Sequence, residues 1–186
     1  MKATDYLAKF MAAIGVRDIF GITGGAAVHI IDSISNNPYL NFVPMNHEQA
    51  AAMAADATAR MTGKIGVCVS TSGPGATNLL TGICCSYFDS IPVLAITGQV
   101  PSGDIKTPGL RQLGFQEIAT TEIFKPVTKK IFLVTDASHL PQILNEAVHI
   151  AMSGRPGPVL IDIPDDIQRG EIQLESIMPW SFTAFV

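Results

Sequence analysis

Apolar and polar residues follow two alternating patterns along the chain. Short runs rich in Val, Ile and Phe are interleaved with longer stretches in which apolar residues recur every three or four positions. The first pattern indicates strands and the second indicates amphipathic helices. The predicted strands are 18–22, 40–44, 65–70, 91–97, 125–134 and 157–164, and the predicted helices are 4–14, 26–35, 46–61, 76–86 and 138–153.

This alternation predicts an α/β fold, an open and mainly parallel six-stranded sheet with helices on both faces. The loop 98–117 is long enough for us to expect a functional or mobile segment. Residues 165–176 have the pattern of an exit linker. We therefore assign residues 1–169 to one domain, and we expect residues 170–186 to be a linker toward a next domain that this chain lacks.

Composition narrows the possible partners. Charged residues make up 15% of the chain, whereas about a quarter is usual, which is the pattern expected if other domains or subunits cover much of the surface. The net charge of −4 argues against nucleic-acid binding. No segment approaches the roughly 18 apolar residues of a membrane span, so we expect no membrane partner.

The cysteines predict neither a metal site nor a disulfide framework. Cys68, Cys84 and Cys85 have no Cys-x-x-Cys or Cys/His spacing. We expect buried reduced thiols, which are typical of a cytoplasmic protein.

Two glycine turns follow predicted strands. "GITGGA" (21–26) follows the first strand and "TSGPGATN" (71–78) follows the third. Ligands of open parallel sheets bind outside the carboxyl ends of the strands, and helix-start N–H groups can hold phosphate there. However, the second turn has neither the Gly-x-Gly-x-x-Gly fingerprint nor a P-loop Lys, so it gives little support to nucleotide binding. An ordinary turn between strand and helix stays the alternative.

Glu48 lies at the start of the alanine-rich helix that follows the second strand. Acids there are stabilised by the helix dipole, which is a purely structural explanation. Yet Asn46 and Gln49 already form the pattern of a capping pair, and Asp56 and Arg60 can pair on the outer face. Glu48 is then left at the ligand edge without an obvious partner, where apolar surroundings favour a protonated carboxyl. Both explanations remain open on these residues alone.

Six segments in a fixed order carry a family resemblance. They are "GITGGA", "NHEQAAAMAADATAR", "TSGPGATN", "IPVLAITGQV", "GFQE" and "SGRPGPVLIDIP". Together they resemble the N-terminal, pyrimidine-binding domain of thiamine-diphosphate enzymes of the acetolactate synthase type, over roughly residues 1–169.

The resemblance gives a reason for the single acid. It implies that Glu48 is the catalytic carboxyl that hydrogen-bonds N1′ of the cofactor's aminopyrimidine ring and shares a proton with it. It also implies further cofactor-binding positions at Gly24, Gly25, Thr71, Pro74, Asn78 and Gln116, and a substrate pocket lined by Phe115 and Gln116.

The resemblance further implies the reaction and its other components. Pyruvate would be decarboxylated and its two-carbon unit transferred to a second 2-oxo acid, in a homodimer or homotetramer. The Mg²⁺ ligands would lie in a C-terminal domain with a Gly-Asp-Gly motif, and FAD in a middle domain. Because this chain has no Gly-Asp-Gly motif, we expect it to be inactive alone.

Two departures keep alternatives open. Ile22-Thr23 stands where family members commonly have Tyr-Pro, and residues 83–90 are also atypical. They leave open another thiamine-diphosphate-dependent 2-oxo acid decarboxylase or lyase. From another class, a stand-alone nucleotide-binding module or a non-catalytic interaction domain remains an alternative.

Overall fold

A computed structural model describes residues 1–105 and 109–173. Within these residues one sheet has the strand order β2-β1-β3-β4-β6-β5, and every neighbouring pair is parallel. The α/β fold class expected from the sequence is therefore confirmed. The strands are β1 (Asp18–Gly21), β2 (Asn41–Pro44), β3 (Gly66–Ser70), β4 (Val93–Gln99), β5 (Lys130–Leu133) and β6 (Val159–Pro164).

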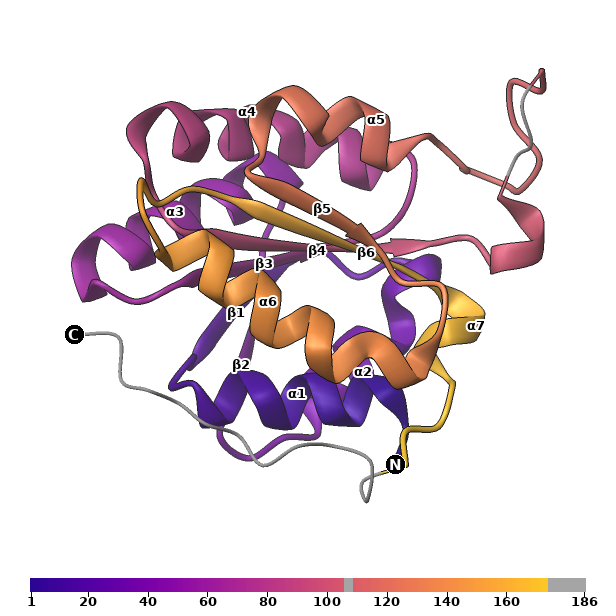
Figure 1. Ribbon diagram of the computed structural model, residues 1–186, viewed down its shortest axis with the longest axis horizontal. Helices are drawn as coiled ribbons and strands as arrows, with labels where there is room; N and C mark the ends of the chain where they lie inside the picture. Colours follow the sequence, from indigo (N-terminus) through magenta and orange to yellow (C-terminus); the bar gives the residue numbers. More distant parts are fainter. Residues whose placement is uncertain (106–108, 174–186) are drawn as a thin grey trace.

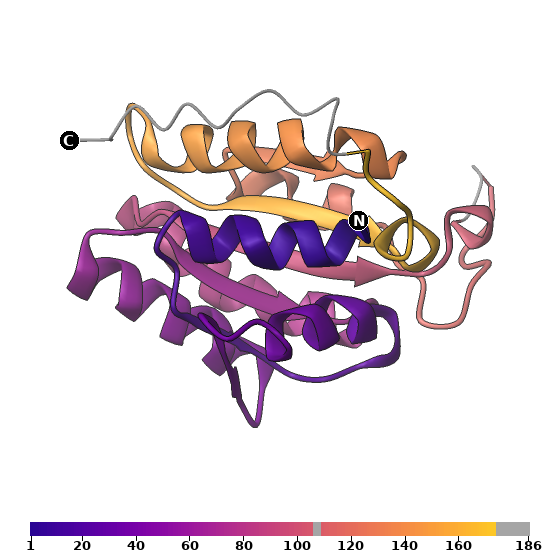
Figure 2. The same cartoon turned by 90° about the horizontal axis from the view of Figure 1, so that it is seen from below.

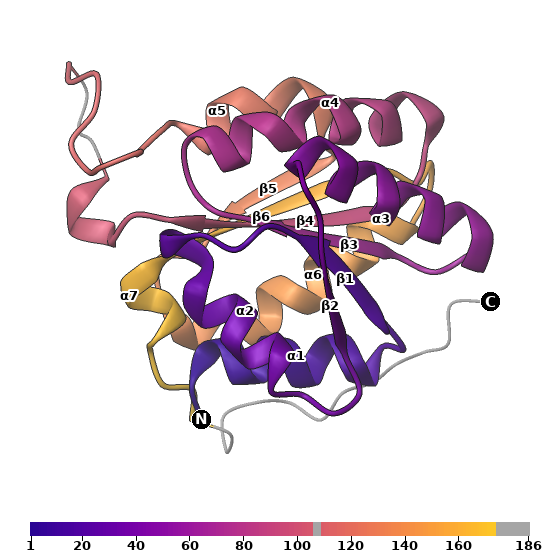
Figure 3. The same ribbon diagram turned by 180° about the vertical axis from the view of Figure 1, so that it is seen from behind.

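Helices cover both faces of the sheet, as Figures 1 and 3 show. On the first face, α1 lies between α2 and α6 (Figure 2). On the second face, α3 packs against α4, and α5 follows alongside α4. The helices are α1 (Ala3–Ala13), α2 (Val28–Ser35), α3 (Glu48–Thr62), α4 (Pro74–Asp89), α5 (Thr120–Phe124), α6 (Leu140–Met152) and α7 (Asp165–Gln168).

The two faces have different cores. Side chains alternate along each strand, so β4 sends Leu94 and Ile96 to the first face and Val93 and Ala95 to the second. The first face buries large aliphatic and aromatic side chains from its three helices. The second face has a smaller apolar cluster, to which α3 contributes only alanines. Short side chains let α3 and α4 approach closely over this face.

Some predicted boundaries were wrong. The strand predicted at 125–134 spans only Lys130–Leu133, because Lys125–Val127 forms a 3₁₀ turn in which Pro126 has no N–H to donate. Asp165–Gln168 is helical, although the sequence pattern predicted a linker there. Ile172 is also buried, and Glu171 forms a β-bridge with Lys2. Ordered packing thus continues past residue 169, while residues 174–186 of the linker predicted at 170–186 lie outside the described residues.

The cysteines differ from one another in exposure. Cys68 in β3 is buried, and its burial raises the pKa of the thiol to about 12. Cys84 is partly buried and Cys85 is exposed, so the expectation of three buried thiols was wrong for Cys85. The described residues contain no cluster of three potential metal ligands, and none of their helices is long and apolar enough to cross a membrane.

Candidate active site at the carboxyl edge

The strand order brings the two glycine turns together. β1 pairs with β2 on one side and β3 on the other, and such a reversal of strand order is where open sheets bind ligands. A Cβ at Gly24 would lie 2.5 Å from Thr71 Cβ, so only glycine fits between the turns. The Ala26 N–H also donates to Thr71 Oγ1 at 3.2 Å. Thr71 therefore joins the turn after β3 to the turn after β1.

The turn after β3 depends on glycine in two ways. Gly73 has φ 58° and ψ −120°, a conformation that side-chain-bearing residues avoid. A Cβ at Gly75 would lie 2.7 Å from Thr71 Cγ2 and 3.4 Å from Glu48 Oε1. Pro74 is the first residue of α4, where its missing N–H has no helical partner to lose. Because Gly75 has no Cβ, the Thr71 side chain and the Glu48 carboxyl can both lie against this turn.

Glu48 is the first residue of α3 and is only 8% exposed. Its Oε2 accepts a hydrogen bond of 3.0 Å from Asn78 Nδ2. Within the part of the chain that the structure describes, no donor is hydrogen-bonded to Oε1. The sequence pattern showed no obvious partner for Glu48, and the structure shows one: Asn78 fixes one carboxyl oxygen and leaves the other beside Gly75.

Gln116 approaches the same turn from the long loop. A Cβ at Gly73 would lie 2.6 Å from the Gln116 carbonyl oxygen, so the two backbones are in contact. Gln116 has φ +57°, one of two non-glycine residues with positive φ among the described positions. Such strain recurs at functional sites. Its neighbour Phe115 is 84% exposed.

Comparison with known proteins identifies the family. The sequence matches the family described as "Thiamine pyrophosphate enzyme, N-terminal TPP binding domain" over residues 1–123. The chain belongs to this family.

Similar proteins are acetolactate synthases by name. The chain is 50% identical over 170 residues to "Acetolactate synthase" of Arthrospira platensis, covering 90% of this chain and 28% of the relative. It is 47% identical over 175 residues to "Probable acetolactate synthase large subunit" of Methanocaldococcus jannaschii, covering 94% of this chain and 29% of the relative. With the "Acetolactate synthase large subunit" of Corynebacterium glutamicum, the identity is 48% over 172 residues, covering 92% and 27%. The chain thus spans less than a third of the length of these relatives.

In this thiamine diphosphate-binding domain, the predicted cofactor residues divide into two groups. Five of them contact one another or a glycine of the turn after β3: Gly24, Glu48, Thr71, Asn78 and Gln116. Gly25 and Pro74 lie on the turns but are exposed, and a Cβ at Gly25 would meet no atom within 4 Å. Contact with the cofactor remains a prediction for all seven.

The predicted start of α3 was wrong in detail. His47, not Asn46, caps the helix, because His47 Nδ1 accepts the Gln49 N–H at 3.1 Å. Asn46 is exposed. The other end lies one residue beyond the predicted position 61: the helix ends at Thr62, and Gly63 follows it with φ +69°. Glu48 is not needed as the cap in either arrangement.

The predicted pair of Asp56 and Arg60 forms, but not on the outer face. Asp56 is buried and accepts from Ser86 Oγ of α4 at 2.7 Å. Arg60 Nε donates to Asp56 at 2.5 Å, and its Nη2 reaches Asp89 of α4 at 2.6 Å. These contacts join the carboxyl-terminal half of α3 to α4, and thereby help to fix the helix that begins with Glu48.

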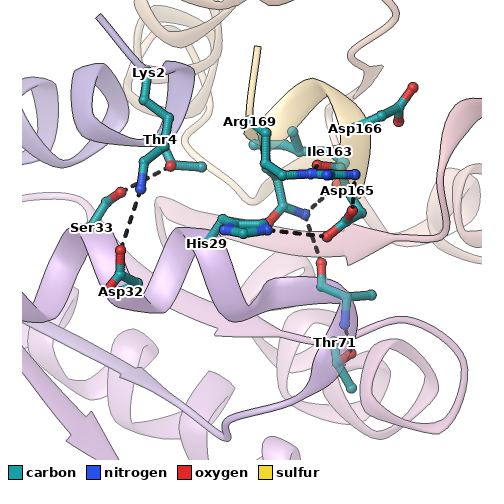
Figure 4. A network of polar contacts seen from close by, with 12 residues as sticks. Lys2, Thr4, His29, Asp32, Ser33, Thr71, Ile163, Asp165, Asp166 and Arg169 are labelled. Carbon is teal, nitrogen blue, oxygen red and sulfur yellow. Dashed lines mark hydrogen bonds and ion pairs between the residues drawn. The ribbon is translucent and has the colours of Figure 1, made fainter.

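No sequence pattern indicated a structural role for Gln168 of α7. Its Nε2 donates to the Ala26 carbonyl at 2.6 Å and to the Ile163 carbonyl at 2.8 Å. His29 Nε2 lies 3.6 Å from Asp165 at the start of the same helix. Figure 4 shows His29 beside Asp165, and Thr71 on the other side of the turn. Because residues 165–176 were interpreted as a linker, their support of the first glycine turn could not be foreseen.

Proposed function

We propose that this chain provides the aminopyrimidine-binding side of an acetolactate synthase-like active site, with Glu48 as its catalytic carboxyl. One observation carries the proposal: Asn78 holds Glu48 Oε2, while Oε1 is left beside a turn whose glycines present no side chains. The names of the relatives support the choice of reaction.

The residues present fit the pyrimidine end of thiamine diphosphate. The missing Cβ at Gly75 lets Thr71 and the Glu48 carboxyl lie close to the turn, so a flat ring held at this turn would meet that carboxyl. Glu48 offers one carboxyl oxygen that is fixed and one that can hydrogen-bond a ring nitrogen. Thr71 would line the ring between the two turns.

Glu48 would hold and move one proton. Because Glu48 is only 8% exposed, a proton on Oε1 would be shared chiefly with an atom of the bound ligand. Asn78 donates to Oε2 and so directs the mobile proton to Oε1. When bound, thiamine diphosphate supplies the electron sink for decarboxylation of a 2-oxo acid.

The proposed reaction also needs components that other parts of the enzyme would bind. Pyruvate would donate a two-carbon unit to a second 2-oxo acid, and Phe115 and Gln116 would line the substrate pocket. Mg²⁺, FAD and the diphosphate would bind to other parts of a cytoplasmic homodimer or homotetramer. By this proposal the 186-residue chain alone binds the cofactor weakly and does not turn over pyruvate, because charge-assisted contacts to the diphosphate are missing.

The test is Glu48→Gln in the complete enzyme that the proposal entails. Glutamine keeps a hydrogen bond but cannot share a proton, so deuterium exchange at C2 of the bound cofactor should slow about 10²–10⁴-fold. Glu122→Gln is the matched control, because Glu122 is an exposed acid in the first turn of α5. Circular dichroism should show both variants folded. Unchanged exchange in Glu48→Gln would reduce Glu48 to a helix-start acid.

A further inference from the structure

Asp162 is a buried carboxyl that the proposed function does not use. It lies in β6, where it is 1% exposed among Val, Leu and Ile residues. Its strand partner is Thr97 of β4, whose Oγ1 donates to Asp162 Oδ1 at 2.6 Å. Placing a carboxyl in such surroundings is costly unless several donors satisfy it. The site is therefore expected to have a specific role.

Gln99 connects Asp162 to the long loop. It lies two residues beyond Thr97 on β4 and so on the same face. Its Nε2 donates to Asp162 Oδ2 at 3.1 Å, and lies 3.1 Å from the Ile118 carbonyl and 3.2 Å from Thr120 Oγ1. Its Oε1 accepts the Val100 N–H at 3.0 Å. One side chain thus joins the buried carboxyl to the end of the loop and the start of α5.

The segment 114–120 returns from the long loop to the ligand edge, and Figure 1 shows this loop projecting from the sheet before α5 begins. Gly114 packs on Val100, since a Cβ there would lie 2.9 Å from Val100 Cγ1. Gln116 then meets Gly73. Only residue 117 separates Gln116 from Ile118, which Gln99 holds. A shift of Gln99 would therefore be passed directly to Gln116.

We propose that Asp162 is a positioning residue: it fixes the Gln99 amide, and Gln99 fixes residues 114–120 so that Phe115 and Gln116 keep their place at the ligand edge. That these two residues line a substrate pocket rests on the proposed function. The mechanical link from Asp162 to the segment does not.

The first experiment measures amide hydrogen exchange by mass spectrometry in the 186-residue chain. Asp162→Asn places an amide donor opposite the Gln99 amide, and Gln99→Met removes the amide while keeping the volume. Loss of one hydrogen bond should speed exchange of peptides within 113–120 about three- to tenfold in both variants. Ser33→Ala is the control, because Ser33 is a buried hydroxyl bonded to Thr4 and Asp5 on the first face.

The location of the change decides the outcome. Faster exchange within 113–120, with strands β3 and β1 unchanged and Ser33→Ala without effect there, supports the proposal. Equal acceleration throughout the sheet would mean an ordinary core residue, and unchanged exchange in Gln99→Met would exclude the link through Gln99. Either result overturns the proposal. Gln99→Met keeps the test valid should Asp162→Asn fail to fold.

The second experiment uses the complete enzyme. In Asp162→Asn, the KM for the 2-oxo acid should rise about tenfold, while C2 deuterium exchange stays within twofold, because Glu48 and Asn78 are untouched. A C2 exchange rate that fell as strongly as the KM rose would contradict a positioning role. Failure of the proposed function gives a different result: C2 deuterium exchange would be unchanged in Glu48→Gln. Amide hydrogen exchange of residues 113–120 would still test the role of Asp162 in that case.

Discussion

The two faces of the sheet use the same strands for different purposes. On the first face, β6 contributes Val159, Ile161 and Ile163 to a core of large apolar side chains. On the second, the same strand contributes Leu160 and the carboxyl of Asp162. Buried polar groups also occur on α3 and α4 of this face, namely Glu48, Asp56 and Ser86. Alternation along one strand thus separates a face that stabilises the domain from a face that holds the site.

The two faces therefore contribute differently to the stability of the fold and to the chemistry of the site. Apolar burial stabilises by about 25 cal/mol per Å², so the first face can supply most of the stability. Buried polar groups contribute little net stability, because hydrogen bonds replace those lost to water. The second face therefore specifies geometry, and substitutions there should change activity more than their cost in stability suggests.

The largest effect on stability is expected from truncation of the first face. Leu144→Ala in α6 removes a fully buried side chain from that core and should lower the free energy of unfolding by about 2–5 kcal/mol. Leu79→Ala in α4 is the matched change on the second face. Urea unfolding of the chain measures the free energy of unfolding of both variants.

The two leucine variants should differ in their rates of C2 exchange. Leu79 follows Asn78, the donor to Glu48, so its truncation should also slow C2 exchange in the complete enzyme. Leu144→Ala should keep the normal rate per folded molecule. Equal loss of activity in both variants would contradict the division of roles between the faces.

A smaller effect concerns the pH dependence of stability. Burial raises the pKa of Asp162 to about 7, although hydrogen bonds from Thr97, Gln99 and Thr120 act in the opposite direction. The folded chain thus holds this proton more tightly than the unfolded chain, in which an Asp titrates near pH 4. The stabilisation is complete below about pH 4 and is lost as the pH rises to about 7, a change on the order of 2–4 kcal/mol.

Asp162→Asn tests this directly. The variant should have a flatter profile of unfolding free energy between pH 4 and 7, because residue 162 no longer titrates. Hydrogen bonds from Ser138 lower the pKa of Asp136, and those from Ser102 lower the pKa of Asp166 against the effect of burial. Their stabilisation is lost only at lower pH, outside this window. A profile equally steep in the variant would show that another group is responsible.

Local pattern predicted much of the fold, because periodicity and glycine turns act over a few residues. It placed the six strands and the turns that flank Glu48, and the family resemblance added the residues around them. It could not supply contacts that depend on strand order. β6 lies between β4 and β5, and this insertion creates the pairing of Thr97 with Asp162, 65 residues away.

Three other features of the site were not predicted, one for a local reason and two because they depend on tertiary packing. A histidine ring nitrogen is an unusual helix cap, so His47 was passed over for Asn46. Gln168 stands in a polar stretch whose composition is typical of a linker, and only its docking against Ala26 shows its role. Asn78 was expected to lie against the cofactor, and its bond to Glu48 depends on how closely α3 and α4 pack.

The smallest of these effects on stability should follow from adding one methyl group between α3 and α4. In Gly82→Ala the new Cβ would lie 2.5 Å from Ala52 Cβ and 3.2 Å from the Gln49 carbonyl oxygen, so α3 and α4 would have to move apart. Overpacking of this kind costs about 1–3 kcal/mol. Because Gly82 lies one turn beyond Asn78, the separation should also lengthen the Asn78–Glu48 hydrogen bond and slow C2 exchange in the complete enzyme.

Ala52→Gly in the same chain removes the opposing methyl group, and it should restore C2 exchange despite costing up to about 1 kcal/mol of helix propensity. A double-mutant cycle of unfolding free energies and exchange rates measures this coupling. If the two substitutions were simply additive, the close approach of α3 and α4 would not be what holds Glu48 against Asn78.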